Sequence, residues 1–359
     1  MLEFRLEEKM KFCKEYQNHM NEQPNKVPKI GYKRLKHSLK QCRTHIQSQP
    51  ENKPECTKCD EKFFGSLLDE MSAVAECFNK QAKKLLHPPL LKGIWKYYCV
   101  GCNGNGFEKG DAPLVKKGEN LLIYAMFNAI AFRKILKKYD KVHNCEKGQA
   151  FRRGEQVKHK EILHSPWFCE LMAFHMNLRD RKLKSGSGEA NAFFEGLVLA
   201  FSAEEKPSMT CELFRSTRVD VDLTCSICLV SQNAMAISSF IKQPFLGWSA
   251  LTTMNSKKQD TVFDAVALKC GHILCYMCAC SAASVTIVDG LKMAEPHKKC
   301  PLCRQNGVYG GAIHLEELNI LLSRRCPDYW RKRLETERVE RLRLVKEHWQ
   351  SQCRAFVGV

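Results

Sequence analysis

Eight candidate metal ligands lie between residues 225 and 303, in four closely spaced pairs. Zn²⁺ prefers cysteine thiolates and histidine nitrogens, and a gap of two residues lets one turn present two cysteines to one ion. Because a structural zinc takes four ligands in a tetrahedron, eight ligands predict two zinc sites. The alternative is a set of buried free thiols. The ligands are Cys225, Cys228, Cys270, His272, Cys275, Cys278, Cys300 and Cys303.

The order of these ligands, with the histidine in fourth place, resembles the RING finger, in which the pairs interleave in a cross-brace. In that family both zinc ions are structural and closed, and most members dock a ubiquitin-conjugating enzyme charged with ubiquitin. The resemblance implies that one zinc binds Cys225, Cys228, Cys275 and Cys278, and that the other binds Cys270, His272, Cys300 and Cys303.

The same resemblance assigns residues to docking of the conjugating enzyme. Ile227 lies inside the first ligand pair, and Pro301 and Leu302 lie inside the last, where the family places two apolar contacts. Arg304 follows the last ligand, where active ligases often carry a linchpin cation that would hold the conjugating enzyme and ubiquitin together. The resemblance implies no covalent nucleophile in the ligase. Taken singly, each residue is also an ordinary core, turn or surface residue.

The gap between Cys228 and Cys270 holds 41 residues, which is longer than RING fingers usually allow. Deleting Val230–Gln259 leaves 11 residues, an ordinary length for the family. We therefore interpret this stretch as an insertion or an unspliced segment. The alternative is a genuine long loop, because the entropy cost of loop closure grows only logarithmically with length. Since the stretch borders the docking face, it bears on ligase competence.

Two further cysteine pairs have the spacing of a zinc ribbon. They are Cys56 with Cys59 and Cys99 with Cys102. The first pair begins a predicted helix and no independent small fold surrounds the four residues, so we favour free thiols. A third metal site is the alternative.

Two basic stripes are predicted on helices in the first half of the chain. Residues three, four and seven positions apart share a helix face, so like charges at that spacing repel one another. Neither stripe carries neutralising acids, which favours an anionic ligand over an idle solvated face. One stripe holds Lys134, Lys137, Lys138 and Lys141, and the other holds Tyr32, Lys33, Lys36, Lys40 and Arg43.

Three motifs, "MKFCKEYQNHM" at 10–20, "YKRLK" at 32–36 and "KILKKYDK" at 134–141, together resemble the SPX domain, a helical bundle that senses inositol phosphates. The resemblance covers residues 10–180. A phosphate-rich ligand needs several ammonium groups gathered on rigid helices. The resemblance implies a binding cluster of Tyr32, Lys36 and Lys138, flanked by Lys134, Lys137 and Lys141, with a further contact from Lys11.

The charge of the chain is +18 and unevenly spread. Residues 11–141 hold 25 lysines and arginines against 13 acids, a surplus of 12 that favours nucleic acid, acidic lipid or phosphorylated small molecules. "MLEFRLEEKM" has no signal-peptide pattern, and no apolar stretch reaches the roughly 18 residues of a spanning helix. We therefore expect an intracellular protein, in the nucleus or cytoplasm or brought to the plasma membrane by its substrate, whose thiols stay reduced.

The patterns predict a multidomain chain of four parts. An all-α bundle over 10–180 contains an amphipathic helix at 120–142 and ends its second long helix before His87-Pro88-Pro89. A linker over 181–222 contains two strands, at 193–201 and 212–223. The zinc finger spans 223–308. Two charged helices separated by Pro327 fill 309–359, where Leu342, Val345 and Trp349 are expected to pack on the preceding domain or on a partner helix.

An SPX domain followed by a RING finger resembles the plant nitrogen-limitation-adaptation ligases, and the match continues through "GVYGGAIHLEELNILL" and "DYWRKRLETERVERL". That family implies a RING-type E3 ubiquitin-protein ligase that ubiquitinates a membrane phosphate transporter. It implies regulation by an inositol polyphosphate or pyrophosphate, in phosphate and nitrogen homeostasis. This chain departs from the family at Met1–Lys9, ahead of the usual "MKF" start, and at Val230–Gln259.

Two other classes fit parts of the pattern. A zinc protein could bind nucleic acid through the basic half, but that half lacks an interleaved aromatic platform or a groove-reading motif, so we expect no nucleic acid partner. A catalytically inactive SPX adaptor would retain both domains, and an autoubiquitination assay would discriminate it from a ligase.

Overall fold

The fold is known from a computed structural model of the 359-residue chain. It describes residues 12, 14–21, 27–48, 57–86, 111–154, 157, 160–184, 197–203, 207–213, 217–228 and 261–357. Among these residues no helix has the length and apolar character needed to cross a membrane. The chain divides into two compact units, one of residues 1–171, 182–197 and 213–217, and one of residues 172–181, 198–212 and 218–359.

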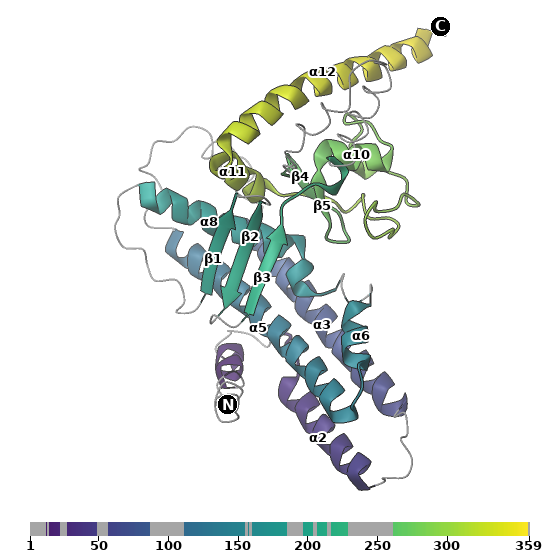
Figure 1. The fold of residues 1–359 in the computed structure, drawn as a ribbon. Helices are drawn as coiled ribbons and strands as arrows, with labels where there is room; N and C mark the ends of the chain where they lie inside the picture. The colour runs from purple at the N-terminus through teal and green to yellow at the C-terminus, as the bar shows by residue number, and fades with distance from the viewer. Residues whose placement is uncertain are drawn as a thin grey trace, which may run out of the picture. The chain divides into compact units, whose positions relative to one another are not determined.

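The first unit is built from helices, as the sequence predicted. They are α2 (Tyr32–Ser48), α3 (Thr57–Leu86), α5 (Asp111–His143), α6 (Lys147–Arg153), the short 3-10 helix η1 (Ile162–His164) and the start of α8 (Pro166–Lys184). Helix α5 packs against α2, α3, α6 and η1, and so forms the centre of the unit (Figure 1). Helix α3 ends at Leu86, before the two prolines, which cannot continue a helix.

Helix α5 differs from the amphipathic helix that the sequence predicted. It begins at Asp111 rather than near residue 120, and every residue from Leu121 to Phe132 is buried. Only from Arg133 onward do buried and accessible positions alternate with helical period. The expectation was wrong for the first half because neighbouring elements cover that stretch on all sides, and few of its residues are polar.

A buried polar network fixes the chain just before α2. The Oδ1 atom of Asn128 in α5 accepts the N–H of Ile30 and the hydroxyl of Tyr16, both at 3.0 Å. The Tyr124 hydroxyl donates to the carbonyl of Pro28 at 2.6 Å, and the Gly31 N–H donates to Glu70 of α3 at 2.8 Å. Because buried polar groups are costly when unpaired, these contacts hold the start of α2 firmly against α3 and α5.

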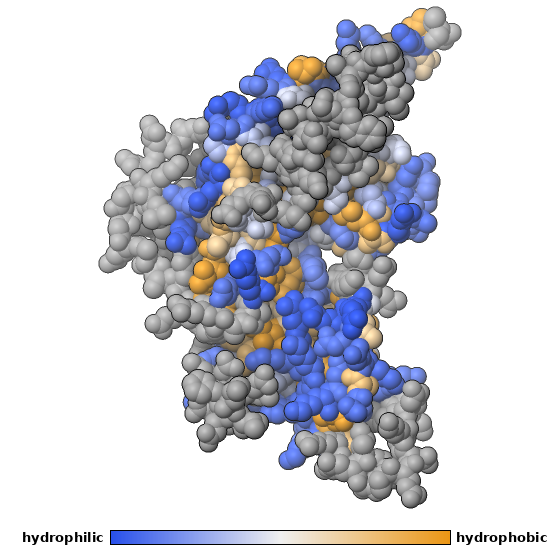
Figure 2. All heavy atoms as spheres, in the orientation of Figure 1, coloured by the Kyte–Doolittle hydropathy of each residue, from blue (hydrophilic) through white to orange (hydrophobic). Residues whose placement is uncertain are grey.

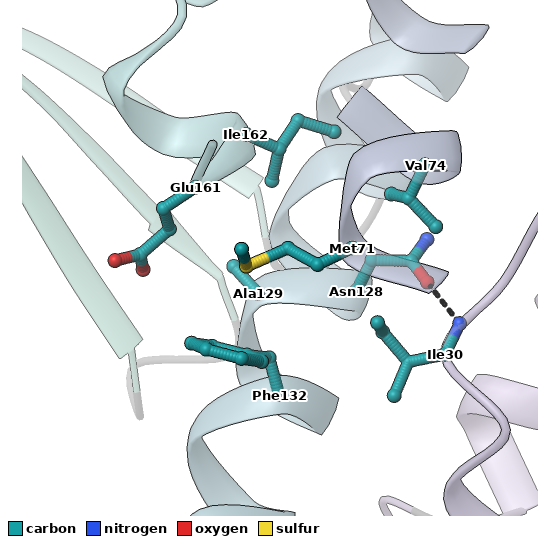
Figure 3. Close-up of a pocket in the computed structure, with 8 residues that line it drawn as sticks. All are labelled: Ile30, Met71, Val74, Asn128, Ala129, Phe132, Glu161 and Ile162. Carbon is teal, nitrogen blue, oxygen red and sulfur yellow. Dashed lines mark hydrogen bonds between the residues drawn. The ribbon is translucent and has the colours of Figure 1, made fainter. Parts of the chain in front are cut away.

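A small cavity lies beside this network (Figure 3). Its lining is mostly apolar, and its one ionisable side chain is Glu161, which is paired with Arg133 at 2.9 Å. An apolar pocket with an acid at its edge does not suit an anionic ligand. The lining residues are Ile30, Met71, Val74, Asn128, Ala129, Phe132, Glu161 and Ile162.

The strands near residue 200 form a sheet of order β1-β2-β3. The strands are β1 (Leu197–Ser202), β2 (Ser208–Leu213) and β3 (Thr217–Asp222). Two strands were expected here. The second expected strand, 212–223, is instead divided between the end of β2 and β3, because residues 214–216 separate the two strands.

The second unit is centred on a small sheet of order β5-β4-β6. Strand β4 (Ala265–Ala267) lies antiparallel to β5 (Ile273–Cys275) and to β6 (Ile313–His314), with Ala265 opposite Cys275. Buried residues of β4 meet the buried sides of α10 (Tyr276–Ala283) and α11 (Glu316–Arg325). The 3-10 helix η3 (Leu291–Met293) lies between α10 and α11 along the chain.

The chain ends in the helix α12 (Pro327–Val357), which Pro327 begins, as predicted. Proline suits a first helical position because that residue needs no N–H partner. Of the three apolar residues expected to pack on the preceding domain or on a partner helix, Val345 is half-buried, whereas Leu342 and Trp349 are 63% and 56% exposed, so packing on a partner helix stays a prediction for these two. Hydrophobic side chains are visible on the surface of this helix in Figure 2.

Candidate functional site

The structure brings the eight predicted metal ligands into two groups of four. In each group the candidate ligand atoms all lie within 4.8 Å of one another. The groups interleave along the chain, since the first and third pairs meet in one group and the second and fourth in the other. The first group is Cys225, Cys228, Cys275 and Cys278, and the second is Cys270, His272, Cys300 and Cys303.

Short elements of the second unit position the first group. Cys228 lies in the helical stretch at 226–228, and Cys275 ends β5 and is the residue that precedes α10, whose first turn carries Cys278. The Sγ of Cys228 lies 3.6 Å from that of Cys275 and 3.3 Å from that of Cys278. With Zn–S bonds of about 2.3 Å, two sulfurs of a tetrahedral site lie about 3.8 Å apart, so the group fits a zinc ion.

Two tight turns position the second group. Gly271, at φ 89°, allows the chain to reverse between Cys270 and His272, and few other residues adopt that conformation easily. The Nδ1 atom of His272 lies 3.3 Å from the Sγ of Cys270 and 3.7 Å from that of Cys300. The group therefore offers three sulfurs and one nitrogen at zinc-site spacing.

Crowding shifts the pKa values of these thiols in opposite directions. Hydrogen bonding, first of all from Cys228, lowers the pKa of Cys225 far below its usual value. A hydrogen bond from Cys270 lowers the pKa of Cys300, and the same contact raises the pKa of Cys270. One thiolate in each group is thus stabilised by the protons of its neighbours. A divalent cation would replace those protons, which is the chemistry of a zinc–thiolate site.

The predicted basic stripes lie on α2 and α5, two helices that pack against each other. Lys36, Lys137 and Lys141 are exposed, whereas Tyr32, Lys134 and Lys138 are half-buried. On the face drawn in Figure 2, hydrophilic side chains predominate over the end of the first unit that carries α2 and the second half of α5.

Phe12 connects the two stripes. Its ring meets the ring of Tyr32 edge-on at 5.9 Å between centroids, and the Nζ of Lys134 lies 3.9 Å from its centroid. A cation over an aromatic face is attracted to the ring, so Phe12 is a common neighbour of Lys134 in α5 and Tyr32 in α2.

Two acids, one on α5 and one on α3, have partners outside the basic stripes. The carboxylate of Asp140 accepts the N–H groups of Gly148 at 2.6 Å and Gln149 at 3.1 Å, and so caps the start of α6. Asp60 of α3 accepts the Tyr139 hydroxyl, and it pairs with Lys147 at 3.0 Å.

Some predicted residues lie outside the part that the structure describes. They are Lys11, the stretch Val230–Gln259, Cys56, Cys99, Cys102, and the side chains of Arg43 and Cys59.

Relatives of known class share almost the whole chain. It is 50% identical over 357 residues to the probable E3 ubiquitin-protein ligase BAH1-like 1 of Oryza sativa subsp. indica, covering 98% of this chain and 100% of that protein. It is 47% identical over 368 residues to the E3 ubiquitin-protein ligase NLA of Arabidopsis thaliana, with the same coverage. The chain belongs to this family of plant E3 ubiquitin-protein ligases. The family predicted from the sequence motifs is thereby confirmed, and with it the ubiquitin transferase class.

A more distant member of the ligase family, the probable E3 ubiquitin-protein ligase BAH1-like of Arabidopsis thaliana, is 35% identical over 351 residues and 92% of both chains. No protein-family model and no solved structure matches the chain.

The docking residues predicted for this ligase lie at accessible positions of the second unit. Ile227 is half-buried on the turn between two ligands of the first group. Pro301 and Leu302 are exposed on the turn between two ligands of the second group. Arg304 is exposed at φ 63°, an uncommon conformation for a residue with a side chain, and its N–H donates to the Cys300 carbonyl at 2.9 Å. Each residue is therefore placed by the ligands next to it.

Arg333 of α12 was not identified from the sequence as a site residue. Its Nη2 lies 3.5 Å from the Sγ of Cys228, and its Nε donates to Glu337 at 3.1 Å. The spacing of Arg333, Glu337 and Arg341 predicts ion pairs along one helix face. Nothing in that spacing indicates a cysteine 105 residues away as the further partner.

Proposed function

We propose that this ligase is of the RING type, with two structural zinc ions that assemble the face on which a ubiquitin-conjugating enzyme docks. The observation that supports it most strongly is the interleaving of two complete sets of four ligands, because each zinc then ties together segments far apart in the chain. Ile227 lies between two ligands of the first set, and Leu302 lies between two ligands of the second. The two ions together would therefore fix the position of Ile227 relative to Leu302.

In the proposed reaction the conjugating enzyme carries ubiquitin as a thioester. A substrate amine attacks the thioester carbonyl, so that an amide bond to ubiquitin forms, the C–S bond breaks and the thiol of the conjugating enzyme leaves. The ligase contributes no bond-forming atom. Its apolar residues Ile227, Pro301 and Leu302 hold the conjugating enzyme. Arg304 donates hydrogen bonds to both that enzyme and ubiquitin, which holds the thioester in an orientation open to attack. The zinc ions supply structure only, since both sets have four protein ligands and leave no open position.

An autoubiquitination assay on the zinc-loaded full chain tests this docking face. Ile227→Ala and Arg304→Ala should each slow ubiquitin transfer about tenfold, since one buried contact or charged hydrogen bond contributes about 1.5–3 kcal/mol. Zinc content should stay unchanged in both. Met293→Ala and Arg338→Ala remove an exposed apolar residue and an exposed cation of the same unit and should leave transfer unchanged. Parental transfer rates in both docking variants would refute the assignment.

We also propose that the helical unit is an SPX domain that binds an inositol polyphosphate or pyrophosphate and regulates the ligase. Support comes from Tyr32 and Lys134, which meet at Phe12, from Lys36 and Lys138 on the same two helices, and from the engagement of Asp140 elsewhere. The proposed protein substrate is a membrane phosphate transporter, which rests on the family resemblance alone. Ubiquitination of such a transporter, measured with and without inositol pyrophosphate, tests both steps.

A further inference from the structure

One face of helix α12 packs beside the first ligand group. Tyr329 donates its hydroxyl to the Thr261 carbonyl at 2.5 Å, and the Trp330 ring lies 4.4 Å from that of Phe263. The Phe263 N–H in turn donates to the Sγ of Cys275 at 3.2 Å. The first turn of the helix is thus docked on the segment that supports the cysteines.

The same helix face carries a chain of ion pairs toward the cysteines. Residues 333, 337 and 341 are four positions apart and share that face. Glu337 is only 4% exposed and accepts Nε of Arg333 at 3.1 Å and Nη2 of Arg341 at 3.0 Å. Arg341 also donates to Asp264 at 2.7 Å, which anchors the network to the strand-bearing part of the unit. These contacts fix the direction in which the Arg333 guanidinium points.

The fixed guanidinium reaches one ligand of the first group. Its Nη2 lies 3.5 Å from the Sγ of Cys228, within hydrogen-bond distance for a sulfur acceptor. The guanidinium of an arginine stays protonated in proteins, so the Arg333 side chain is a cation. A planar guanidinium can hold a carboxylate on one edge and a sulfur on the other, which an ammonium cannot do in the same fixed geometry.

The two ligand groups differ in charge once each holds a zinc ion. Four thiolates around Zn²⁺ carry a formal charge of −2, whereas three thiolates and a neutral histidine carry −1. The cation therefore meets the more negative group. Hydrogen bonds to ligand atoms adjust both the orientation and the basicity of the ligand, and their loss typically lowers metal affinity about 10- to 100-fold.

We propose that Arg333 is a positioning residue of the first zinc site, where it donates to the Cys228 thiolate and protects that site from electrophiles and from loss of zinc. This inference rests on the proposed pair of zinc ions. The cation draws electron density from the sulfur, so the thiolate is a weaker nucleophile while it remains bound to the metal. Helix α12 is by this account a functional part of the metal-binding unit rather than an appendage to it.

The test uses the zinc-loaded full chain, treated with N-ethylmaleimide while a chromogenic chelator reports zinc release and peptide mass spectrometry reports the alkylated cysteines. Arg333→Met and Arg333→Gln should release one of the two zinc ions about tenfold faster than the parent, with Cys228 alkylated first. Arg333→Lys, which keeps the charge, should lie closer to the parent than either. Arg331→Met removes an exposed arginine of the same helix and should match the parent.

Two results would overturn the inference. One is release at the parental rate in both neutral variants. The other is release from Arg333→Lys as fast as from Arg333→Met, which would mean that packing of the side-chain stem matters and its charge does not. If Arg333→Met does not fold, the comparison of Gln with Lys decides, since both keep a polar end. Fewer than two zinc ions in the parent would instead refute the proposed zinc pair.

Discussion

At the residue scale, the acid that lies within the basic stripe of α5 has its carboxylate engaged elsewhere. Asp140 lies between Lys138 and Lys141 in sequence, yet its carboxylate caps α6. Lys134 lies over the Phe12 ring, and the same ring meets Tyr32 edge-on. Positive charge is therefore gathered on rigid helices before any ligand binds, and the repulsion among these lysines would be relieved by a bound anion.

Lys36→Ala and Lys138→Ala should each weaken binding of inositol hexakisphosphate at least about tenfold, because each removes a charge-assisted hydrogen bond of about 1.5–3 kcal/mol. Isothermal titration calorimetry on the full chain measures this. Lys62→Ala, an exposed lysine of α3, is the matched control and should bind as the parent does. Saturating ligand should also raise the melting temperature of the parent by mass action. Equal affinity in the parent and both variants would exclude this site.

The roles of residues with strict chemical requirements could be predicted from the sequence. The roles of residues whose partners lie far away in the chain could not. Cys225 and Cys300 were readable because zinc ligands recur at fixed spacing. Asn128 was not, since its partners Ile30 and Tyr16 lie 98 and 112 residues away. Arg333 was readable as a helix ion pair, but its contact with Cys228 depends on how α12 docks.

At the element scale, the placement of α2 depends on the segment before it. Asn128→Ala leaves the Ile30 N–H without its partner and removes one bond of the Tyr16 hydroxyl. A buried unpaired group costs about 1–3 kcal/mol, so the free energy of unfolding of the helical unit should fall by about that amount. Urea denaturation of the full chain, followed by circular dichroism, checks this. Ser38→Ala, on the exposed side of α2, should change it by less than about 0.5 kcal/mol.

Unchanged stability in Asn128→Ala would contradict this account of the network. Weaker binding of inositol hexakisphosphate should accompany the loss of stability, because α2 then no longer holds Tyr32 and Lys36 in place.

The chain just before Cys228 pairs with the chain just after the stretch Val230–Gln259. Thr224 pairs with Thr261, and the Val262 N–H donates to the Leu223 carbonyl at 2.8 Å. Deleting Val230–Gln259 should therefore leave two zinc ions bound and preserve or raise ubiquitin transfer, as measured by elemental analysis and autoubiquitination. Replacing Val230–Gln259 by a glycine–serine segment of equal length is the control, because it distinguishes an effect of the length of the segment from an effect of its sequence. A deletion variant that does not fold would show that the segment is integral.

Element boundaries were predictable where a residue forbids continuation. Pro327 separates α11 from α12, and the prolines after Leu86 end α3. The burial of α5 from Leu121 to Phe132 was not predictable from its own pattern, because a helix enclosed on all sides has no polar face to reveal its period. The pattern of α12 does not distinguish packing on the preceding domain from packing on a partner helix, and Leu342 and Trp349 remain exposed in this chain.

At the scale of the whole molecule, the proposed ligase depends on zinc for its second unit. Among the described residues, the second unit has two small sheets and few long helices apart from α12, and the two ligand groups join segments that lie far apart in the chain. Binding of a structural zinc contributes on the order of 10–16 kcal/mol in small zinc domains, which matches or exceeds the stability of a typical domain. Removal of zinc should therefore unfold this unit and leave the helical unit folded.

The most direct test is a chelation series in which zinc content and ubiquitin transfer are measured on the same samples of the full chain. We predict two zinc ions per chain in the untreated protein, and a loss of transfer that follows the loss of zinc. Helical circular dichroism from the first unit should persist. Transfer at the parental rate by protein that contains no zinc would contradict the account, as would one zinc ion or none in fully active protein.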